Sequence, residues 1–216
     1  MVVSVSIKVG FGLKKFFVIT FAVCLIGYFL INLPSTQKKI LYPFPYRETV
    51  EDLSARYQVD RFLAISVMKV ESNFAENARS KSGAVGLMQI MPETAAWIAS
   101  CLDEEPPNLN KLSDSDTNIK YGIWYLAELE DEFFGNDILA LAAYNAGRGN
   151  VRHWIEKNGW QKNFSDVDAI PYTETRNYVK RVLHCREKYN ELYSWSNFYK
   201  LVELSELRFA SLKFVY

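Results

Sequence analysis

Glu71 is the residue in this sequence whose setting best suits acid–base chemistry. It stands at the end of a nearly unbroken apolar run that begins at Phe62. A carboxyl group in apolar surroundings loses the hydration of its charged form, so its pKa rises and it can hold a proton near neutral pH. Such a group is suited to protonating a leaving-group oxygen, as glycosidic cleavage demands. On position alone, an ordinary helix-end glutamate that points into water is the commoner case, so the rest of the chain must decide.

The element that carries Glu71 is predicted to be a buried helix. Asp60 is a good N-cap for a helix that ends near Ser72. Because this segment is apolar on nearly every side, we expect it to be the central helix of its domain. A further helix is predicted before it, over Arg47 to Tyr57.

The segment from Asn73 to Met91 has no helical period. Gly83 and Gly86 indicate turns and close approach of the backbone, so we expect a small irregular β element near Gly83 to Gln89. Helices are predicted again in the rest of the chain: a short one after Pro92, then 116–134 ended by Gly135, 137–144, 151–157 capped by Asn150, and a last one from Thr173 past Arg186, with 103–110 as a loop. The pattern therefore predicts a mainly α fold.

The amino-terminal region is predicted to lie outside this fold. Residues 16–33 are eighteen residues without a charge, the lower length limit of a membrane-spanning helix. A cleaved signal peptide would normally have a shorter apolar core and small residues at its cleavage point, which Leu33-Pro34-Ser35-Thr36 does not offer. We therefore favour an uncleaved signal anchor, with 1–15 as a short cytoplasmic segment and 34–46 as a stiff proline-rich linker.

Composition narrows the classes of ligand. The 25 basic and 25 acidic residues cancel, and no basic stripe is visible, so nucleic acid is not expected as a partner. His153 and His184 lack ligand-like neighbours, so neither a metal nor a cofactor is expected. Cys101 and Cys185 follow the apolar segment, and the sequence leaves open whether they form a disulfide.

Four segments in one order resemble a known family. They are Glu71-Ser72, Ser80 to Pro92, Ala143 to Gly147, and Ile170 to Val179. Together they resemble the catalytic domain of the soluble-type (SLT) lytic transglycosylases, in the lysozyme-like superfamily. The resemblance covers about residues 46–189 and implies a lysozyme-like α+β domain over 47–192. It leaves 193–216 as a carboxy-terminal extension of unknown role, for which packing on the domain is the first expectation.

The resemblance implies a role for each matching residue. Glu71 is implied to be the catalytic acid and then the base. The positions implied to bind substrate are Ser72, Ser80, Gln89, Met91, Tyr144, Asn145, Glu174 and Tyr178. Ser80 is implied to lie near an N-acetyl group, and Glu174 and Tyr178 to be a buried acid and a tyrosine beneath the cleft.

Several of these residues have simpler explanations. Met91 suits core packing, and Tyr144 suits a core aromatic whose hydroxyl is paired. Glu174 lies in a first helical turn, where the helix dipole favours an acid without any chemistry. Ser72 suits a hydroxyl that pairs with local backbone at a helix end.

Glycosidases ordinarily use two carboxylates, and substrate assistance is an exception. Within the matching motifs only Glu71 has a suitable setting, since Glu76 and Glu93 match no catalytic position of the family. The resemblance implies a membrane-anchored enzyme that cleaves the MurNAc-GlcNAc bond of peptidoglycan strands and leaves 1,6-anhydro ends outside the cytoplasmic membrane. A hydrolytic muramidase and a non-catalytic glycan-binding module are the alternatives, and the sequence leaves protein partners unknown.

Overall fold

The computed structural model describes the backbone of residues 9–212 and the side chains of residues 15–194. The chain divides into two units, Met1–Pro43 and Phe44–Tyr216, which are described separately below.

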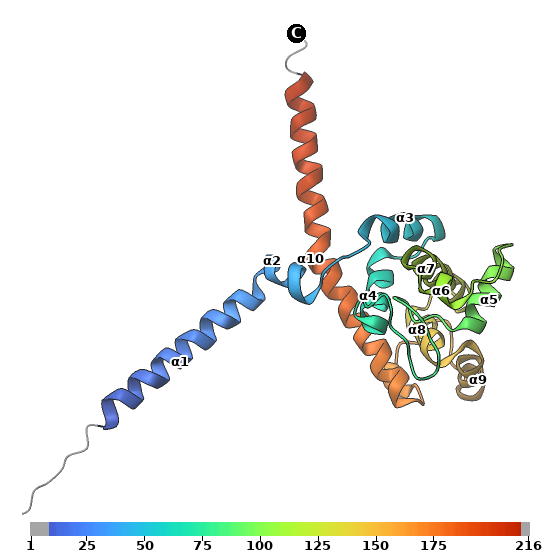
Figure 1. The fold of residues 1–216 in the computed structure, drawn as a ribbon, viewed down its shortest axis with the longest axis horizontal. Helices are drawn as coiled ribbons and strands as arrows, with labels where there is room; N and C mark the ends of the chain where they lie inside the picture. Colours follow the sequence, from blue (N-terminus) through green and yellow to red (C-terminus); the bar gives the residue numbers. More distant parts are fainter. Residues whose placement is uncertain (1–8, 213–216) are drawn as a thin grey trace, which may run out of the picture. The chain divides into compact units, whose positions relative to one another are not determined.

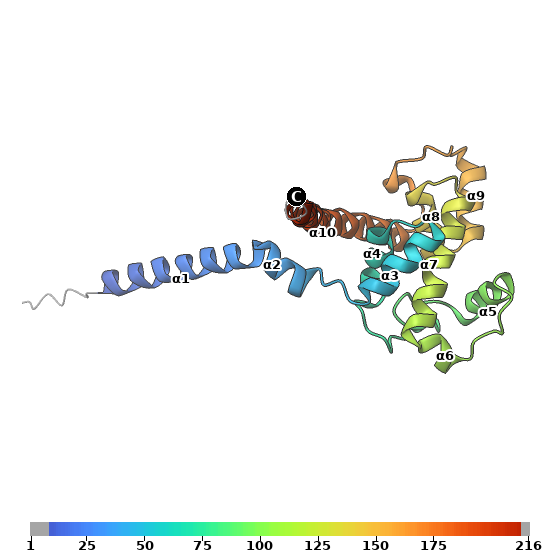
Figure 2. The same ribbon diagram turned by 90° about the horizontal axis from the view of Figure 1, so that it is seen from above.

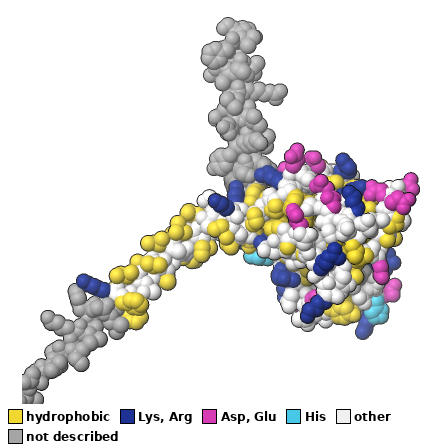
Figure 3. Space-filling view, in the orientation of Figure 1, with side chains coloured by type: hydrophobic (Ala, Val, Ile, Leu, Met, Phe, Trp, Pro, Cys, Tyr) yellow, Lys and Arg dark blue, Asp and Glu magenta, His cyan; other side chains and the backbone are white. Residues whose placement is uncertain are grey.

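The first unit is dominated by one apolar helix, α1 (Val9–Asn32). Its large hydrophobic side chains are exposed, and they cover its surface in Figure 3. Among the described residues, Lys15–Asn32 is the one stretch long and apolar enough to cross a membrane. The segment after it is the one predicted to be a stiff proline-rich linker over 34–46. It contains α2 (Pro34–Thr36) and a π-helical turn (Gln37–Leu41), because proline is tolerated in the first turn of a helix.

The second unit is built from helices, which confirms the predicted mainly α fold. In chain order they are α3 (Arg47–Tyr57), α4 (Arg61–Ser72), α5 (Pro92–Cys101), α6 (Leu109–Ser113), α7 (Ser115–Glu132), α8 (Asp137–Ala146), α9 (Arg148–Asn158), a 3-10 turn (Val167–Ala169) and α10 (Thr173–Leu212). Figures 1 and 2 show α4 inside this unit, with α5 and α9 on its side away from α10's carboxy-terminal half.

Helix α4 is the central helix, as predicted. The Asp60 side chain accepts a hydrogen bond from the Phe62 backbone N–H at 2.8 Å and caps its start. Every residue from Phe62 to Met68 is buried. The helix packs against α3 and α10 and ends at Asn73, which adopts the left-handed conformation.

Two helix starts differ from the predictions. Helix α9 begins at Arg148, so the predicted cap Asn150 lies inside it, where its side chain donates to the Ala146 carbonyl at 2.7 Å. The break between α8 and α9 falls at Gly147, whose φ of 90° favours glycine. The loop predicted over 103–110 runs directly into α6, which the side chain of Asn108 caps by accepting from the Lys111 N–H at 2.9 Å.

The segment between α4 and α5 forms the small β element that was predicted. It consists of two antiparallel bridges, Arg79 with Val85 and Val85 with Ile90. Asn118 of α7 is fully buried beneath it. The Asn118 amide donates to the Val85 and Leu112 carbonyls, at 2.9 Å each, and accepts from the Met88 N–H at 2.7 Å. A side chain of α7 therefore fixes the backbone of this segment.

The carboxy-terminal extension continues α10 without a break to Leu212. The side chains from residue 195 onward lie outside the described residues, so packing of the whole extension on the domain remains untested. Cys101 is exposed, Cys185 is buried, and both are free thiols, which answers the question of a disulfide between them in the negative.

Gly122 of α7 offers a test of how tightly the β element is packed. A Cβ atom at this position would lie 2.2 Å from the sulfur and 2.7 Å from the Cβ of buried Met88. We expect Gly122→Ala to lower the free energy of unfolding by about 1–3 kcal/mol, because overpacking outweighs the gain in helix propensity.

The matched control is Gly149→Ala in α9, where nothing lies within 4 Å of the added Cβ. We expect its thermal midpoint to equal or exceed that of the wild type. A Gly122→Ala protein that unfolds at the same temperature as Gly149→Ala would contradict the packing described here.

Candidate active site

Glu71 lies in the last turn of α4 and is half-buried. Burial raises the pKa of its carboxyl group to about 7, while interactions with the Tyr178 hydroxyl and with the positive charge of Arg181 act to lower it. Both protonation states are therefore accessible near neutral pH, which is the property required of a group that acts as an acid and as a base.

Two tyrosines from different helices flank this carboxyl group electrostatically. Tyr144 comes from α8 and Tyr178 from α10. Burial is the main cause that raises the pKa of each phenol well above its usual value, and the charge of Glu71 is the second. Both tyrosines are therefore neutral hydrogen-bond donors at physiological pH, close enough to Glu71 to respond to its charge.

The two hydroxyl groups differ in their partners. Tyr144 donates to the Met88 carbonyl at 2.8 Å, which ties α8 to the β element. The Tyr178 hydroxyl is buried and makes no hydrogen bond of regular geometry with the described residues. Its interaction with Glu71 nevertheless acts to lower the pKa of the acid. An interaction of this sign stabilises the ionised form of Glu71.

Ser72 pairs with backbone, as the simpler explanation held. Its hydroxyl donates to the Leu87 carbonyl at 2.7 Å, with Met68 as a longer alternative acceptor at 3.2 Å, and it accepts from the Phe74 N–H at 3.1 Å. Ser72 thereby joins the end of α4 to the β element beside Glu71. Its expected contact with substrate stays a prediction.

Three further residues predicted to bind substrate lie between α4 and the start of α5, and they differ in exposure. Ser80 is exposed and accepts a hydrogen bond from the Ala84 N–H at 2.9 Å, so its own proton is free to be donated. Gln89 has a φ of 48° and directs its amide nitrogen to the Gly86 and Ala78 carbonyls, at 2.9 and 3.2 Å. Met91 is half-buried at the N-cap of α5.

Asn145 and Glu174, two more residues predicted to bind substrate, differ in burial. Asn145 is half-buried, and its side-chain oxygen accepts from the Thr175 hydroxyl at 2.8 Å. Glu174 is exposed, so the expectation that it is a buried acid beneath the cleft is wrong. The inward face of α10 is formed instead by Thr175, Tyr178 and residues one helical turn further on.

Sequence reasoning missed three residues that shape the site. Thr175 holds Asn145, Asn118 holds the β element, and Arg181 contributes a positive charge near Glu71. A polar residue at an inward position of a helical pattern was the available signal for Asn118 and Thr175. Within the described part of the chain, no group of three or more His, Cys, Asp or Glu residues is arranged to hold a metal.

The fold and the site define a lysozyme-like helical domain with one half-buried acid, whose charge acts on a half-buried tyrosine of α8 and a buried tyrosine of α10. The sequence matches the family described as "Transglycosylase SLT domain" over residues 48–167, and the chain belongs to this family.

Related proteins have corresponding names. The "Soluble lytic murein transglycosylase" of Escherichia coli (strain K12) is 34% identical over 144 residues, which cover 66% of this chain and 22% of that protein. The "Membrane-bound lytic murein transglycosylase C" of Actinobacillus pleuropneumoniae is 31% identical over 166 residues, covering 67% of this chain and 45% of that protein. The chain therefore spans less than half the length of these relatives.

Solved structures agree with the family. The crystal structure of the 70 kDa soluble lytic transglycosylase of Escherichia coli superimposes with a TM-score of 0.67 at 31% identity, covering 72% of this chain and 25% of that one. A complex of the 70 kDa soluble lytic transglycosylase with bulgecin A gives a TM-score of 0.65 at 33% identity, over 69% of this chain and 24% of the other.

The raised pKa of Glu71 predicts how stability depends on pH. The pKa of its carboxyl group is about 7 in the folded state, against an ordinary value of 4.5. Between these values the folded state binds more protons than the unfolded state, so stability falls as pH rises. We expect Glu71→Gln to match the wild type near pH 4 and to be more stable by roughly 1–3 kcal/mol at pH 8, measured by urea unfolding across pH.

Glu130 is the matched control, because burial also raises its pKa to about 7. We expect Glu130→Gln to flatten the pH dependence of stability to a similar extent, since burial is the main cause of both raised pKa values. Equal pH dependence in Glu71→Gln and wild type would refute the assigned burial.

Proposed function

We propose that this protein is a membrane-anchored lytic murein transglycosylase in which Glu71 acts first as the acid and then as the base. The observation that carries the proposal is the setting of Glu71. Burial raises its pKa to about 7, and the two groups that act to lower it are Tyr178 and Arg181. A two-carboxylate mechanism needs a second acid within about 5–10 Å.

In the first step, the proton of Glu71 passes to the oxygen between N-acetylmuramic acid and N-acetylglucosamine. The bond from C1 of the muramoyl sugar to this oxygen breaks, and the N-acetyl group of the same sugar stabilises the cationic centre as an oxazolinium. Substrate assistance of this kind removes the need for a protein nucleophile. The Glu71 carboxylate left behind is stabilised by Tyr178 and Arg181, the two groups that lower its pKa.

In the second step, Glu71 takes the proton of the 6-hydroxyl of the muramoyl sugar. The oxygen of this hydroxyl attacks C1, and the bond between C1 and the N-acetyl oxygen breaks, which restores the N-acetyl group. The 1,6-anhydro ring closes, and Glu71 is protonated again. No water is consumed, and the acid is ready for the next cycle. Tyr144 of α8 responds to the charge of Glu71, Asn145 follows it in the same helix, and Ser80 has a proton to donate. We assign these three residues to the sugar.

Membrane attachment through α1 is the second part of the proposal. The helix is apolar, and the relative named membrane-bound lytic murein transglycosylase C supports this attachment. Since murein lies outside the cytoplasmic membrane, we place residues after Leu33 outside and the amino terminus inside.

The products of digestion test the chemistry. We expect wild-type protein to release anhydro-muropeptides from purified peptidoglycan, with mass spectrometry as the measurement. Glu71→Gln removes the proton and the base together, and a loss of rate of at least 100-fold is expected from general acid–base catalysis. Glu174→Gln, at an exposed position, serves as the matched control and retains most of the rate. Reducing ends in place of anhydro products would identify a hydrolytic muramidase.

The topology is tested with a reporter. We expect alkaline phosphatase, which is active outside the cytoplasm, to be active when fused after Tyr216. The same fusion without residues 16–33 is the control and is expected to be inactive. Activity of a cytoplasm-restricted reporter at the same position would place the domain on the wrong side of the membrane for this function.

A further inference from the structure

The residues that follow α1 form a separate helical segment over 34–41, which we name the juxtamembrane segment. Helix α1 is interrupted at Leu33, whose ψ of 130° is extended, because the residue before a proline is pushed out of the helical region. The Gln37 N–H donates to the Leu33 carbonyl at 3.0 Å, and the Tyr42 N–H donates to the Gln37 carbonyl at 2.7 Å. The segment thus pairs backbone groups at its start and at its end within itself, as a segment at a membrane surface must.

The length of the juxtamembrane segment keeps it near the end of α1. Leu41 lies nine residues after Asn32, the last residue of the candidate span. Nine helical residues reach at most about 14 Å, and the headgroup layer of a bilayer is roughly 5–8 Å thick on each side. With α1 across the membrane, the segment therefore starts at the headgroup layer and has little length with which to leave it.

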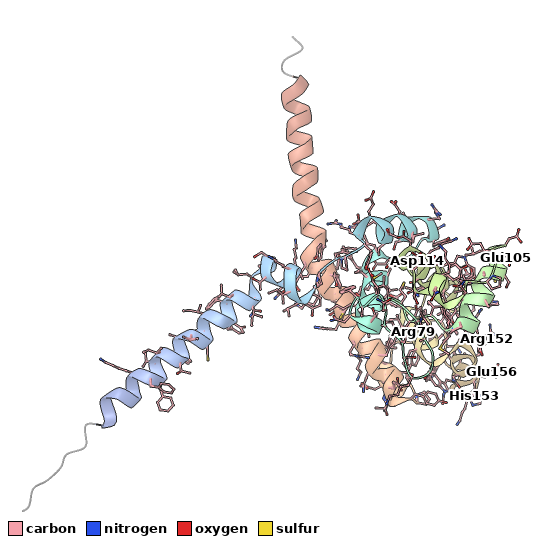
Figure 4. All side chains as sticks on the ribbon, viewed as in Figure 1. Arg79, Glu105, Asp114, Arg152, His153 and Glu156 are labelled. Atoms are coloured by element: carbon pink, nitrogen blue, oxygen red, sulfur yellow. The ribbon has the colours of Figure 1, made fainter. Side chains whose placement is uncertain are left out.

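Exposed apolar surface continues from α1 into this segment. In Figure 4 the side chains of Lys15–Asn32 stand out from the helix, and no residue of this stretch is buried. Leu33 is 46% exposed, and at the end of the segment Ile40 and Leu41 are 69% and 40% exposed. An apolar layer that covers α1 is thus continuous with one that can receive Ile40 and Leu41.

The charge of the segment is positive and is not balanced by a nearby acid in the sequence. Lys38 and Lys39 precede the apolar pair, Lys39 is exposed, and the first acidic residue of the whole chain is Glu48. Lysine side chains beside buried apolar groups can extend their ammonium groups to the headgroup level. Two cations next to an exposed apolar pair are complementary to a surface that is apolar beneath and negative above.

We infer that the juxtamembrane segment lies on the membrane surface, with Ile40 and Leu41 in the apolar boundary and Lys38 and Lys39 on the headgroups of anionic phospholipids. This inference rests on the proposed function, because it requires α1 to span the membrane. It makes the segment a lipid-binding element in place of a spacer.

The test measures the access of water to single positions of the full-length protein in lipid nanodiscs. One fluorescent label is attached in detergent to one cysteine, with exposed Cys101 changed to serine and buried Cys185 retained. Acrylamide quenching is then compared in discs of phosphatidylcholine alone and in discs that also contain phosphatidylglycerol. A label on native Cys24 of α1 gives the shielded limit. A label on Glu48→Cys, at an exposed position of α3 and with Cys24→Ala, gives the water limit.

The informative label is on Ile40→Cys, again with Cys24→Ala. In discs with phosphatidylglycerol we expect its quenching to lie near the shielded limit. Adding Lys38→Gln and Lys39→Gln should lower the ratio of surface-bound to free segment roughly 25-fold in these discs, at about 5-fold for each lysine. In phosphatidylcholine alone, the protein with both lysines and the protein without them should give the same quenching.

The matched control removes two exposed lysines of the second unit, with Lys157→Gln and Lys162→Gln. It lowers the net charge by the same amount and should leave the quenching of the Ile40→Cys label unchanged in both kinds of disc.

The outcomes separate this inference from the proposed function. An Ile40→Cys label at the water limit in both kinds of disc overturns the inference. So does an unchanged label after loss of Lys38 and Lys39, or an equal change in the control. A Cys24 label that acrylamide quenches as strongly as the Glu48→Cys label overturns the membrane attachment through α1 itself.

Discussion

The buried backbone of residues 85–88 is the constraint on which the site depends. Val85, Leu87 and Met88 have almost no exposed surface, yet the segment forms only isolated bridges. Its buried polar groups must be paired within the protein. Side chains from three helices supply the partners: Ser72 of α4, Tyr144 of α8 and Asn118 of α7. Three helices are thereby tied to one irregular segment. Of the three partners, Ser72 follows Glu71 in the sequence, and Tyr144 responds to the charge of Glu71.

A raised pKa alone would not identify the acid. Glu71 and Glu130 both have a pKa of about 7, and burial is the main cause for each. The secondary causes differ. The charges of Asp137 and Asp60 raise the pKa of Glu130, while Arg186, which pairs with both of these aspartates, lowers it. Glu130 is therefore part of a structural ion cluster, whereas Glu71 faces neutral phenols that can support a reaction.

The sequence predicted the parts that follow from periodicity and capping. The buried helix after Asp60 and the β element near Gly83 depend on local pattern, and both are present. Sequence-based prediction was wrong where the role of a residue depends on the direction in which its side chain points. Glu174 lies one residue from the inward Thr175, and a rotation of about 100° per residue puts it in water. Ser72 has hydroxyl chemistry that suits either substrate or backbone, and only the fold places the Leu87 carbonyl within reach.

An acid that acts twice requires two opposing influences. Burial by itself favours the protonated form of Glu71. It would slow proton release in the first step, because the carboxylate that this step leaves behind would be high in free energy. Tyr178 and Arg181 lower this cost. Arg181 is exposed, so solvent and salt screen its contribution. The buried Tyr178 is not screened in this way. Its hydroxyl lacks a regular partner among the described residues, and its interaction with Glu71 acts to lower the pKa of the acid.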